Sequence, residues 1–328
     1  MTLIFTLCSI NYLAQARTLG HSLRLTNPHI RFVIGLVDRL DQSNIPTDKL
    51  PDFELIELHQ IGIHNLAEMY ERYDITELNT AVKPYFIRYF FNNAPLVQNV
   101  VYLDPDIIVY QPLTELENLL QTHDFVVTPH ITQPIDDDLS PSELDHLNTG
   151  IYNFGFIALH KSPQAVEFVK WWEQKLFDEC KIDLCNGLFV DQNWGNFLPF
   201  FWNNVFVQKN IGWNAAYWNL TEKSFSVRDN VHFANDQPVV FFHYSGYDPN
   251  KPTAVSKYQN RHTFEQRPDL KPLFDHYHNE LLRNENSYYR QFDCFYIKPK
   301  RVYKYLTVRR LLKKPFEILY KTITPQSL

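Results

Sequence analysis

Cysteine, glycine and long apolar runs are scarce in this chain of 328 residues. Its four cysteines, Cys8, Cys180, Cys185 and Cys294, are too few and too irregularly spaced for a disulfide scaffold, and none has zinc-ligand spacing. Only nine glycines stand against 20 prolines, which predicts many loops of fixed conformation. No apolar run reaches the length that spans a bilayer.

An excess of positive charge is also missing, since 31 Lys and Arg stand against 37 Asp and Glu, giving a net charge of −6. This balance excludes a generic nucleic-acid binder. The 45% of hydrophobic and 15% of aromatic residues are typical of a globular protein with a sizeable core. The apolar segment 3–10 lacks a positive flank, so we expect a first core strand rather than a signal peptide, and a cytoplasmic protein.

Strand and helix patterns alternate along the first hundred residues, which predicts an α/β fold with a mixed, mainly parallel sheet flanked by helices. The predicted strands cover residues 3–8, 31–37, 53–58, 98–103, 125–128, 151–159 and 239–243. The predicted helices begin at Asn11 and Thr80 and cover residues 163–177, whereas residues 133–146 are predicted to form a polar loop.

Two Asp-x-Asp pairs occur in the sequence. Asp136 and Asp138 lie in the polar loop, and we interpret them as solvated surface. Asp104 and Asp106 directly follow a predicted strand, and Pro105 favours extended backbone before it. Residues i and i+2 of an extended chain point to one face, about 6.5–7 Å apart. Two carboxylates so placed can bind Mg²⁺ or Mn²⁺, and the alternative is a pair of turn or helix-capping side chains.

His243 ends a late apolar run and precedes a turn at Gly246. An imidazole in this place is a candidate third metal ligand, while the alternative is a structural histidine of the core. Lys251, a few residues further on, is a candidate contact for a phosphate.

These residues are part of a longer series of segments that follow one another in a defined order along the chain. The series consists of residues 8–12 (CSINY), Lys83, residues 102–109 (YLDPDIIV), residues 152–156 (YNFGF), residues 190–193 (VDQN) and residues 243–252 (HYSGYDPNKP). Across residues 1–262 it resembles the metal-dependent glycosyltransferases of the GT-A fold, most closely glycosyltransferase family 8 and related bacterial transferases of surface glycans. This sequence departs from the family's pattern at two places. The family usually has Arg at the place of Lys83, and it usually has two residues, not four, between the glycine and the lysine that correspond to Gly246 and Lys251.

The resemblance implies a role for individual residues. It implies contact with the nucleotide sugar by Thr6, Cys8, Ser9, Asn11, Tyr12, Lys83, Asp104, Asn153, Gly246 and Lys251, metal ligation by Asp104, Asp106 and His243, and catalytic contact with the reacting sugar by Asp191 and Gln192. It also implies Mn²⁺ or Mg²⁺ as cofactor, a UDP-sugar as donor, a glycan or lipid-linked acceptor, and retention of the donor's configuration. The donor sugar, the acceptor and the oligomeric state stay open.

The resemblance, together with the helical pattern of the sequence after about residue 263, predicts a division of the chain. Residues 1–262 would form the catalytic domain, with a nucleotide-binding half at 1–110 and an acceptor half at 111–262, followed by a helical extension at 263–328. Residues 298–321 hold nine Lys or Arg and one acid, Glu317, a local charge of +8 that leaves −14 for the remainder. Such a basic, aromatic segment fits either an anionic membrane surface at the inner face of the membrane or a helix docked on its own domain.

Three alternatives compete with a glycosyltransferase. A nucleotidyltransferase would need a glycine-rich phosphate loop near the N-terminus, but only Gly20 lies within the first 34 residues. An inactive GT-A-like module that binds nucleotides or glycans would not need the acidic pair and His243. A membrane-surface adaptor would explain the basic tail but not the first 260 residues.

Overall fold

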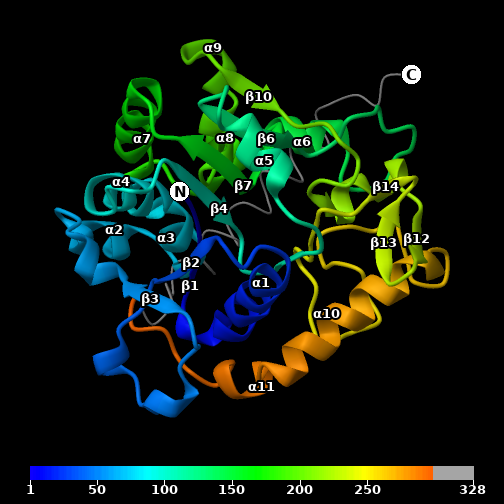
Figure 1. The fold of residues 1–328 in the computed structure, drawn as a ribbon, viewed down its shortest axis with the longest axis horizontal. Helices are drawn as coiled ribbons and strands as arrows, with labels where there is room; N and C mark the ends of the chain where they lie inside the picture. The colour runs from blue at the N-terminus through cyan, green and yellow to red at the C-terminus, as the bar shows by residue number, and fades with distance from the viewer. Residues whose placement is uncertain (298–328) are drawn as a thin grey trace, which may run out of the picture. The chain divides into compact units, whose positions relative to one another are not determined.

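A seven-stranded sheet in the order β10-β6-β7-β4-β1-β2-β3 lies at the centre of the fold (Figure 1). The computed structural model describes residues 1–297. The strands of this sheet are β1 (Thr2–Cys8), β2 (Arg31–Leu36), β3 (Glu54–Glu57), β4 (Asn99–Leu103), β6 (Phe125–Pro129), β7 (Tyr152–His160) and β10 (Val205–Val207). Only β7 runs antiparallel to its neighbours within this sheet. The predicted mixed, mainly parallel α/β sheet is therefore confirmed.

Helices cover both faces of the sheet. The helices of the described chain are α1 (Leu13–Thr26), α2 (Leu66–Arg72), α3 (Ile75–Ala81), α4 (Lys83–Asn93), α5 (Thr114–Leu119), α6 (Glu143–Thr149), α7 (Pro163–Leu176), α8 (Gln192–Gly195), α9 (Leu198–Phe201), α10 (Lys271–Arg283) and α11 (Asn286–Tyr289). Successive strand side chains alternate between two apolar clusters, because neighbouring residues of a strand point to opposite faces. One cluster contains the inner sides of α1, α5 and α10, and the other those of α2, α3, α4 and α7.

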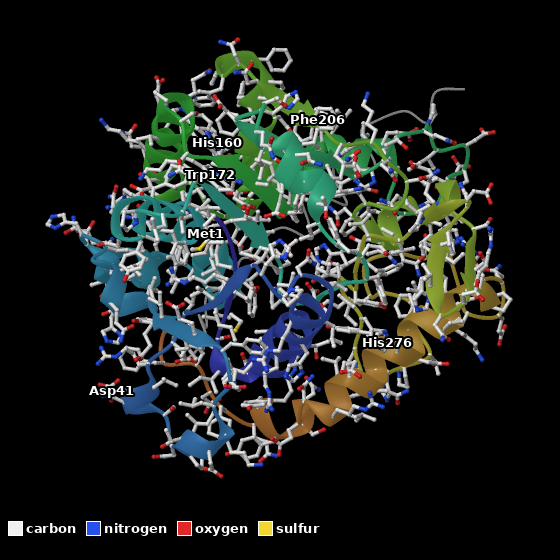
Figure 2. All side chains as sticks on the ribbon, viewed as in Figure 1. Met1, Asp41, His160, Trp172, Phe206 and His276 are labelled. Carbon is white, nitrogen blue, oxygen red and sulfur yellow. The ribbon has the colours of Figure 1, made fainter. Side chains whose placement is uncertain are left out.

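Trp172 and Phe5 illustrate the second of these clusters. Trp172 lies fully buried between α7 and the sheet, whereas Asp41 lies at the outer edge of the molecule (Figure 2). The Phe5 ring packs against those of Phe90 and Tyr102, with both centroids 5.2 Å away. Burying a large apolar side chain contributes about 1.5–3 kcal/mol, so the rows of aromatic residues on both faces hold the sheet and its helices together.

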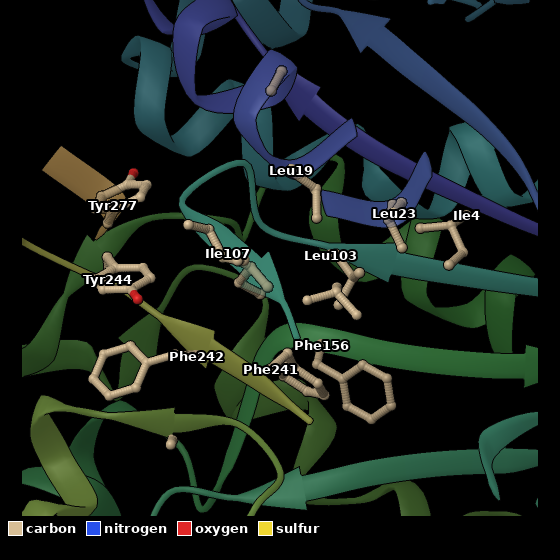
Figure 3. Packing of buried hydrophobic residues seen from close by; sticks show 14 of the residues in the cluster. Ile4, Leu19, Leu23, Leu103, Ile107, Phe156, Phe241, Phe242, Tyr244 and Tyr277 are labelled. Carbon is tan, nitrogen blue, oxygen red and sulfur yellow. The ribbon is translucent and has the colours of Figure 1, made fainter. Parts of the chain in front are cut away.

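A smaller sheet brings the late strand of the sequence to the acidic pair. It contains β11 (Ala215–Ala216), β15 (Phe241–His243) and β5 (Ile107–Val109), in that order. β15 runs antiparallel to β5 with His243 opposite Ile107, and the Tyr244 amide donates to the Asp106 carbonyl at 2.8 Å. Figure 3 shows Phe241 and Phe242 on β15, Tyr244 directly after it, and Ile107 on the neighbouring β5, and all four belong to the apolar cluster on the α1 side of the sheet.

The structure corrects two predicted boundaries. Thr80 does not begin a helix but lies near the end of α3, which starts after Asp74 with a reciprocal capping box to Glu77. The next helix, α4, begins at Lys83 instead. The loop predicted at 133–146 ends in α6, whose first turn is capped by the Ser142 side chain. The remaining strands are β8 (Ile182–Asp183), β9 (Leu188–Phe189), β12 (Phe225–Arg228), β13 (Val231–Ala234) and β14 (Gln237–Pro238).

The helices α10 and α11, which follow position 262, pack onto α1. The compact unit runs over Met1–Tyr296 and includes both α10 and α11. Within the described part of the chain, no helix is long and apolar enough to cross a bilayer. The basic tail predicted at residues 298–321 lies outside the described residues, and the functional division at residue 262 stays a prediction.

Candidate active site

Asp104, Asp106 and His243 converge at one end of β4, as the sequence predicts. One potential ligand atom from each lies within 4.8 Å of the other two. His243 Nε2 is 3.0 Å from Asp106 Oδ1 and 3.5 Å from Asp104 Oδ2. The imidazole is buried, whereas the two carboxylates are 31% and 23% exposed, so the cluster opens to solvent on its acidic side.

The main chain around the cluster explains this geometry. The Asp104 amide donates to the Gly155 carbonyl at 2.8 Å, so Asp104 continues the pairing of β4 with β7. A Cβ at Gly155 would lie 2.6 Å from Asp104 Oδ2 and 2.5 Å from His243 Cε1. Only glycine leaves space for both side chains here. The Tyr102 hydroxyl donates to Asp104 Oδ1 at 2.6 Å and fixes that carboxylate from the other side.

The donor set fits a hard divalent cation. Two carboxylates and one imidazole suit Mn²⁺, and oxygen-rich sites of this kind also suit Mg²⁺. Burial lowers the pKa of His243, but the charges of Asp106 and Asp104 outweigh this effect and raise it overall. The imidazole therefore faces two anions at once, the electrostatic situation that a bound cation would relieve.

Lys83 and Asp191 form a buried ion pair next to this cluster. Lys83 Nζ donates to Asp191 Oδ2 at 2.5 Å and to the Phe154 carbonyl at 2.7 Å, and both side chains are at most 3% exposed. Lys83 also lies 4.2 Å from the centre of the Tyr102 ring. Burial raises the pKa of Asp191 to about 6, although Lys83 acts to lower it. The pair joins the first turn of α4 to the residue that precedes α8.

A buried polar network extends from this pair. Gln192 Oε1 accepts from Asn153 Nδ2 and from the Phe154 amide, both at 3.1 Å. Asn153 Oδ1 accepts from Asn214 Nδ2 at 3.0 Å, and Asn153 Nδ2 lies 3.3 Å from His130 Nε2. The resemblance implies that Asn153, Asp191 and Gln192 contact the nucleotide sugar. In the structure the side chains of Asn153 and Gln192 bond to one another, and Asp191 is engaged by Lys83.

A cavity of about 370 Å³ opens beside Asp106. Tyr12 and Gly246, both predicted to contact the nucleotide, lie in its lining. Gly246 has φ of +74°, which favours glycine, and a Cβ there would lie 2.4 Å from Ser256 Oγ. Lys251 is exposed and is not among the described residues that line this cavity.

Thr6, Cys8, Ser9 and Asn11 lie on the strand and turn that lead to Tyr12. Thr6 and Cys8 are buried in β1, and burial raises the pKa of the Cys8 thiol, so its side chain is a neutral core group. Ser9 Oγ donates to Asn11 Oδ1 at 2.6 Å and shapes the turn. Any contact of these four residues with a nucleotide stays a prediction.

Sequence analysis missed several residues that line the cavity. These are Gln15, Ser245, Tyr247, Asp248, Asn250, Lys257, Tyr258, Tyr277 and Arg290. Tyr277 and Arg290 follow residue 262, where no motif pointed to a site. Lys257 lies six positions beyond Lys251, and only Lys251 of these two is followed by the proline of the Lys-Pro motif.

No protein-family model matches the chain. The uncharacterized protein YfnF of Bacillus subtilis (strain 168) is 27% identical over 250 residues, which cover 74% of this chain and 80% of YfnF. The uncharacterized protein YfnD of the same organism is 22% identical over 195 residues, which cover 58% of this chain and 60% of YfnD. Neither name describes an activity.

Three solved structures similar to the chain are glycosyltransferases, the class that the sequence motifs resemble. The galactosyltransferase LgtC, in complex with donor and acceptor sugar analogs, is 17% identical, with 85% of this chain and 95% of LgtC covered and a TM-score of 0.48. The glycosyltransferase GlyE of Streptococcus pneumoniae TIGR4 is 18% identical, with 90% of this chain and 65% of the GlyE chain covered and a TM-score of 0.44. A glycosyltransferase involved in glycosylation of the major capsid of PBCV-1 is 13% identical, with 75% of this chain and 94% of that chain covered and a TM-score of 0.45. Since these scores lie below 0.5, function has to be inferred from the site itself.

Proposed function

We propose that this chain is a metal-dependent glycosyltransferase. It would move a sugar from a nucleoside-diphosphate sugar, with UDP as the first candidate nucleotide, to a glycan or lipid-linked acceptor. The observation that carries the proposal is the convergence of Asp104, Asp106 and His243 next to a cavity that Asp106 also lines. A cavity of about 370 Å³ is within the range that binds small molecules.

Each residue of the cluster has a task in this proposal. A divalent cation would act as a Lewis acid toward the diphosphate leaving group, and Asp104, Asp106 and His243 would hold it. Tyr102 orients Asp104 through its hydroxyl, as groups behind metal ligands commonly do. Gly155 keeps the space beneath the ligands free of a side chain.

We propose transfer with retention of configuration. The bond between the anomeric carbon and the diphosphate oxygen breaks, a bond from that carbon to the acceptor oxygen forms, and the acceptor's proton goes to the departing diphosphate. Asp191 is engaged by Lys83 and Gln192 is an uncharged amide, which favours this route over a covalent intermediate on either side chain. Both stay our candidates for contact with the reacting sugar.

The test measures release of nucleoside diphosphate from a panel of nucleotide sugars with Mn²⁺. We expect release from one donor, lost with EDTA and in Asp106→Ala. The matched control is Asp136→Ala, which alters the second Asp-x-Asp pair on the exposed loop and should keep full release. An NMR assignment of the product's anomeric configuration then tests retention.

Two other results are informative. A nucleotide could bind only when both Mn²⁺ and Asp106 are present, with no donor releasing its diphosphate. This result would show that the protein does not turn over a donor in the absence of an acceptor. If added glycan acceptors also fail to produce release, an inactive binding module is favoured. If no nucleotide in the panel binds with Mn²⁺ in calorimetry, the proposed function is wrong.

A further inference from the structure

The cavity next to Asp106 carries positive charge from two separate parts of the chain. Lys257 comes from the loop after Gly246, and its amide donates to the Gly246 carbonyl at 3.1 Å. Arg290 comes from the C-terminal end of α11. Both are exposed, and neither forms an ion pair with a carboxylate within the described part of the chain. Neither charge is therefore paired directly within the described part of the chain, and the carboxylates of Asp106 and Asp248 line the same cavity.

Arg290 is held over a residue of the predicted nucleotide-binding turn. Its guanidinium carbon lies 4.0 Å from the centre of the Tyr12 ring, a cation–π contact that restricts a long side chain. The side-chain amides of Gln15 and Asn286 are in contact at 3.0 Å, and in the orientation of the Gln15 amide that satisfies its neighbours its oxygen accepts from Arg290 Nη2 at 3.0 Å. Arg17 Nη1 donates to the Tyr289 hydroxyl at 3.0 Å. These contacts connect α1 to α11 and keep Arg290 at the mouth of the cavity.

Tyr244 connects α10, the helix that precedes α11, to the acidic pair. Its amide donates to the Asp106 carbonyl at 2.8 Å, and its hydroxyl donates to the Leu273 carbonyl of α10 at 3.0 Å. Its ring stacks on that of Tyr277, with centroids 4.0 Å apart and planes 13° apart (Figure 3). The helices after residue 262 are thus fixed relative to Asp106 rather than appended to the fold.

We propose that Lys257 and Arg290 bind the diphosphate of the donor nucleotide, in place of Lys251. This inference rests on the proposed function and names the residues that recognise its donor. Two basic side chains and a carboxylate of the candidate metal site in the wall of one cavity suit a metal-bound diphosphate, which carries about two negative charges when a sugar is attached. The aromatic rings of Tyr12 and Tyr258 on the cavity wall offer faces for the rest of the nucleotide. The C-terminal helices would then be part of the donor site.

The test is calorimetric titration of the full chain, with Mn²⁺ present, by UDP, GDP, ADP, CDP and dTDP, and by the monophosphate of the base that binds. We expect Arg290→Gln and Lys257→Gln each to weaken diphosphate binding about ten-fold or more. Binding of the monophosphate should change less, because the lost contact is with the second phosphate. Arg290→Lys should restore part of the affinity, since it keeps the charge but not the planar guanidinium.

Two further variants complete the comparison. Arg228→Gln removes a basic side chain from the β12–β13 hairpin, outside the cavity lining, and should bind like the unaltered protein. Lys251→Gln represents the competing assignment and is expected to weaken binding less than two-fold. Thermal melting of every variant identifies any loss that comes from unfolding.

The outcomes separate this inference from the proposed function. If the unaltered protein binds none of the diphosphates, the proposed function is wrong and this inference with it. If the unaltered protein binds one of them but folded Arg290→Gln and Lys257→Gln bind it equally well, this inference alone is wrong. A loss confined to Lys251→Gln would assign the diphosphate to the residue that sequence motifs indicate.

Discussion

Gly155 shapes the candidate metal site through the space that it leaves free. It has no side chain, yet it determines how closely Asp104 and His243 can approach, because the space above its Cα is filled by both. We expect Gly155→Ala to displace the two ligands and weaken Mn²⁺ binding in the presence of UDP about 10–100-fold, the usual effect of disturbing the support of metal ligands. Electron paramagnetic resonance of free and bound Mn²⁺ measures this directly.

The control for that variant is Gly187→Ala. Gly187, unlike Gly155, has positive φ, +72°, and its Cβ would meet nothing within 4 Å. Its substitution should cost about 1 kcal/mol of stability from backbone strain and leave Mn²⁺ binding unchanged. Equal Mn²⁺ affinity in Gly155→Ala and the unaltered protein would contradict the role given to Gly155.

His130 makes the stability of the fold depend on pH. Burial lowers its pKa to about 3, and the stacked ring of His146 adds to the effect. The unfolded chain, with an ordinary histidine pKa near 6.5, binds the proton more readily between these values, so stability falls as the pH drops below about 6.5. From pH 7 to pH 5 the expected loss is about 2 kcal/mol.

Urea unfolding at pH 7 and pH 5 tests this dependence. His232 and His262, whose pKa values burial lowers to about 4, contribute to the acid loss in any variant, so the comparison has to isolate His130. We expect His130→Gln to lose about 2 kcal/mol less than the unaltered protein between the two pH values. Equal losses in both proteins would show that His130 does not titrate in this way.

At the scale of elements, the Lys83–Asp191 pair joins α4 to α8 beneath the site. Removing one partner leaves a buried charge without compensation, which costs about 3–5 kcal/mol. We therefore expect Lys83→Met and Asp191→Leu each to be strongly destabilising, and the double variant to regain most of the loss. The exposed pair Arg228–Asp236 is the comparison, and breaking it should cost less than about 1 kcal/mol.

The same double variant distinguishes a structural role of Asp191 from a role in sugar transfer. If Asp191 contacts the reacting sugar, or Lys83 contacts the nucleotide sugar, the double variant should be stable but its sugar transfer should be greatly reduced. Normal transfer by a stable double variant would limit Asp191 to a structural role. If the double variant is no more stable than the single variants, the ion pair does not explain their loss.

Local sequence patterns predicted most elements because their causes are local. The strands β1, β2 and β4 are runs of apolar residues, and α7 begins at the Ser162-Pro163 signal. The start of α6 was missed because the Ser142 capping box lies inside a polar stretch that resembles a loop. The predicted helix start at Thr80 is wrong because Asp74 and Glu77 already form the capping box that starts α3.

The site was predictable only in part. Asp104 and Asp106 are neighbours in the sequence. His243 is a candidate ligand from its place between an apolar run and a glycine turn, and β15 brings it to the pair by pairing with β5. Lys257 and Arg290 have no such signal. Arg290 reaches the cavity because α11 packs on α1, through contacts such as Gln15 to Asn286 that connect residues 271 positions apart. A pairing over that distance depends on the whole fold and leaves no local pattern.

At the scale of the whole molecule, charge is distributed unevenly along the chain. Residues 298–321 carry +8, and the remainder carries −14. Each Lys or Arg close to an anionic bilayer contributes about 1 kcal/mol of binding, and the attraction is screened by salt. An enzyme acting on lipid-linked or cell-surface acceptors would benefit from such an attachment, because it raises the local concentration of both.

We therefore expect the full chain to bind vesicles that contain phosphatidylglycerol in low salt, and to be released at high salt. Vesicles of phosphatidylcholine alone are the control for the lipid. Deleting residues 298–328 should abolish binding, and replacing the nine basic residues by Gln should do so without shortening the chain. Sedimentation with the vesicles measures the bound fraction. Unchanged binding in both variants would contradict a membrane role for the tail, and loss only on deletion would assign it to the apolar and aromatic side chains instead of the charge.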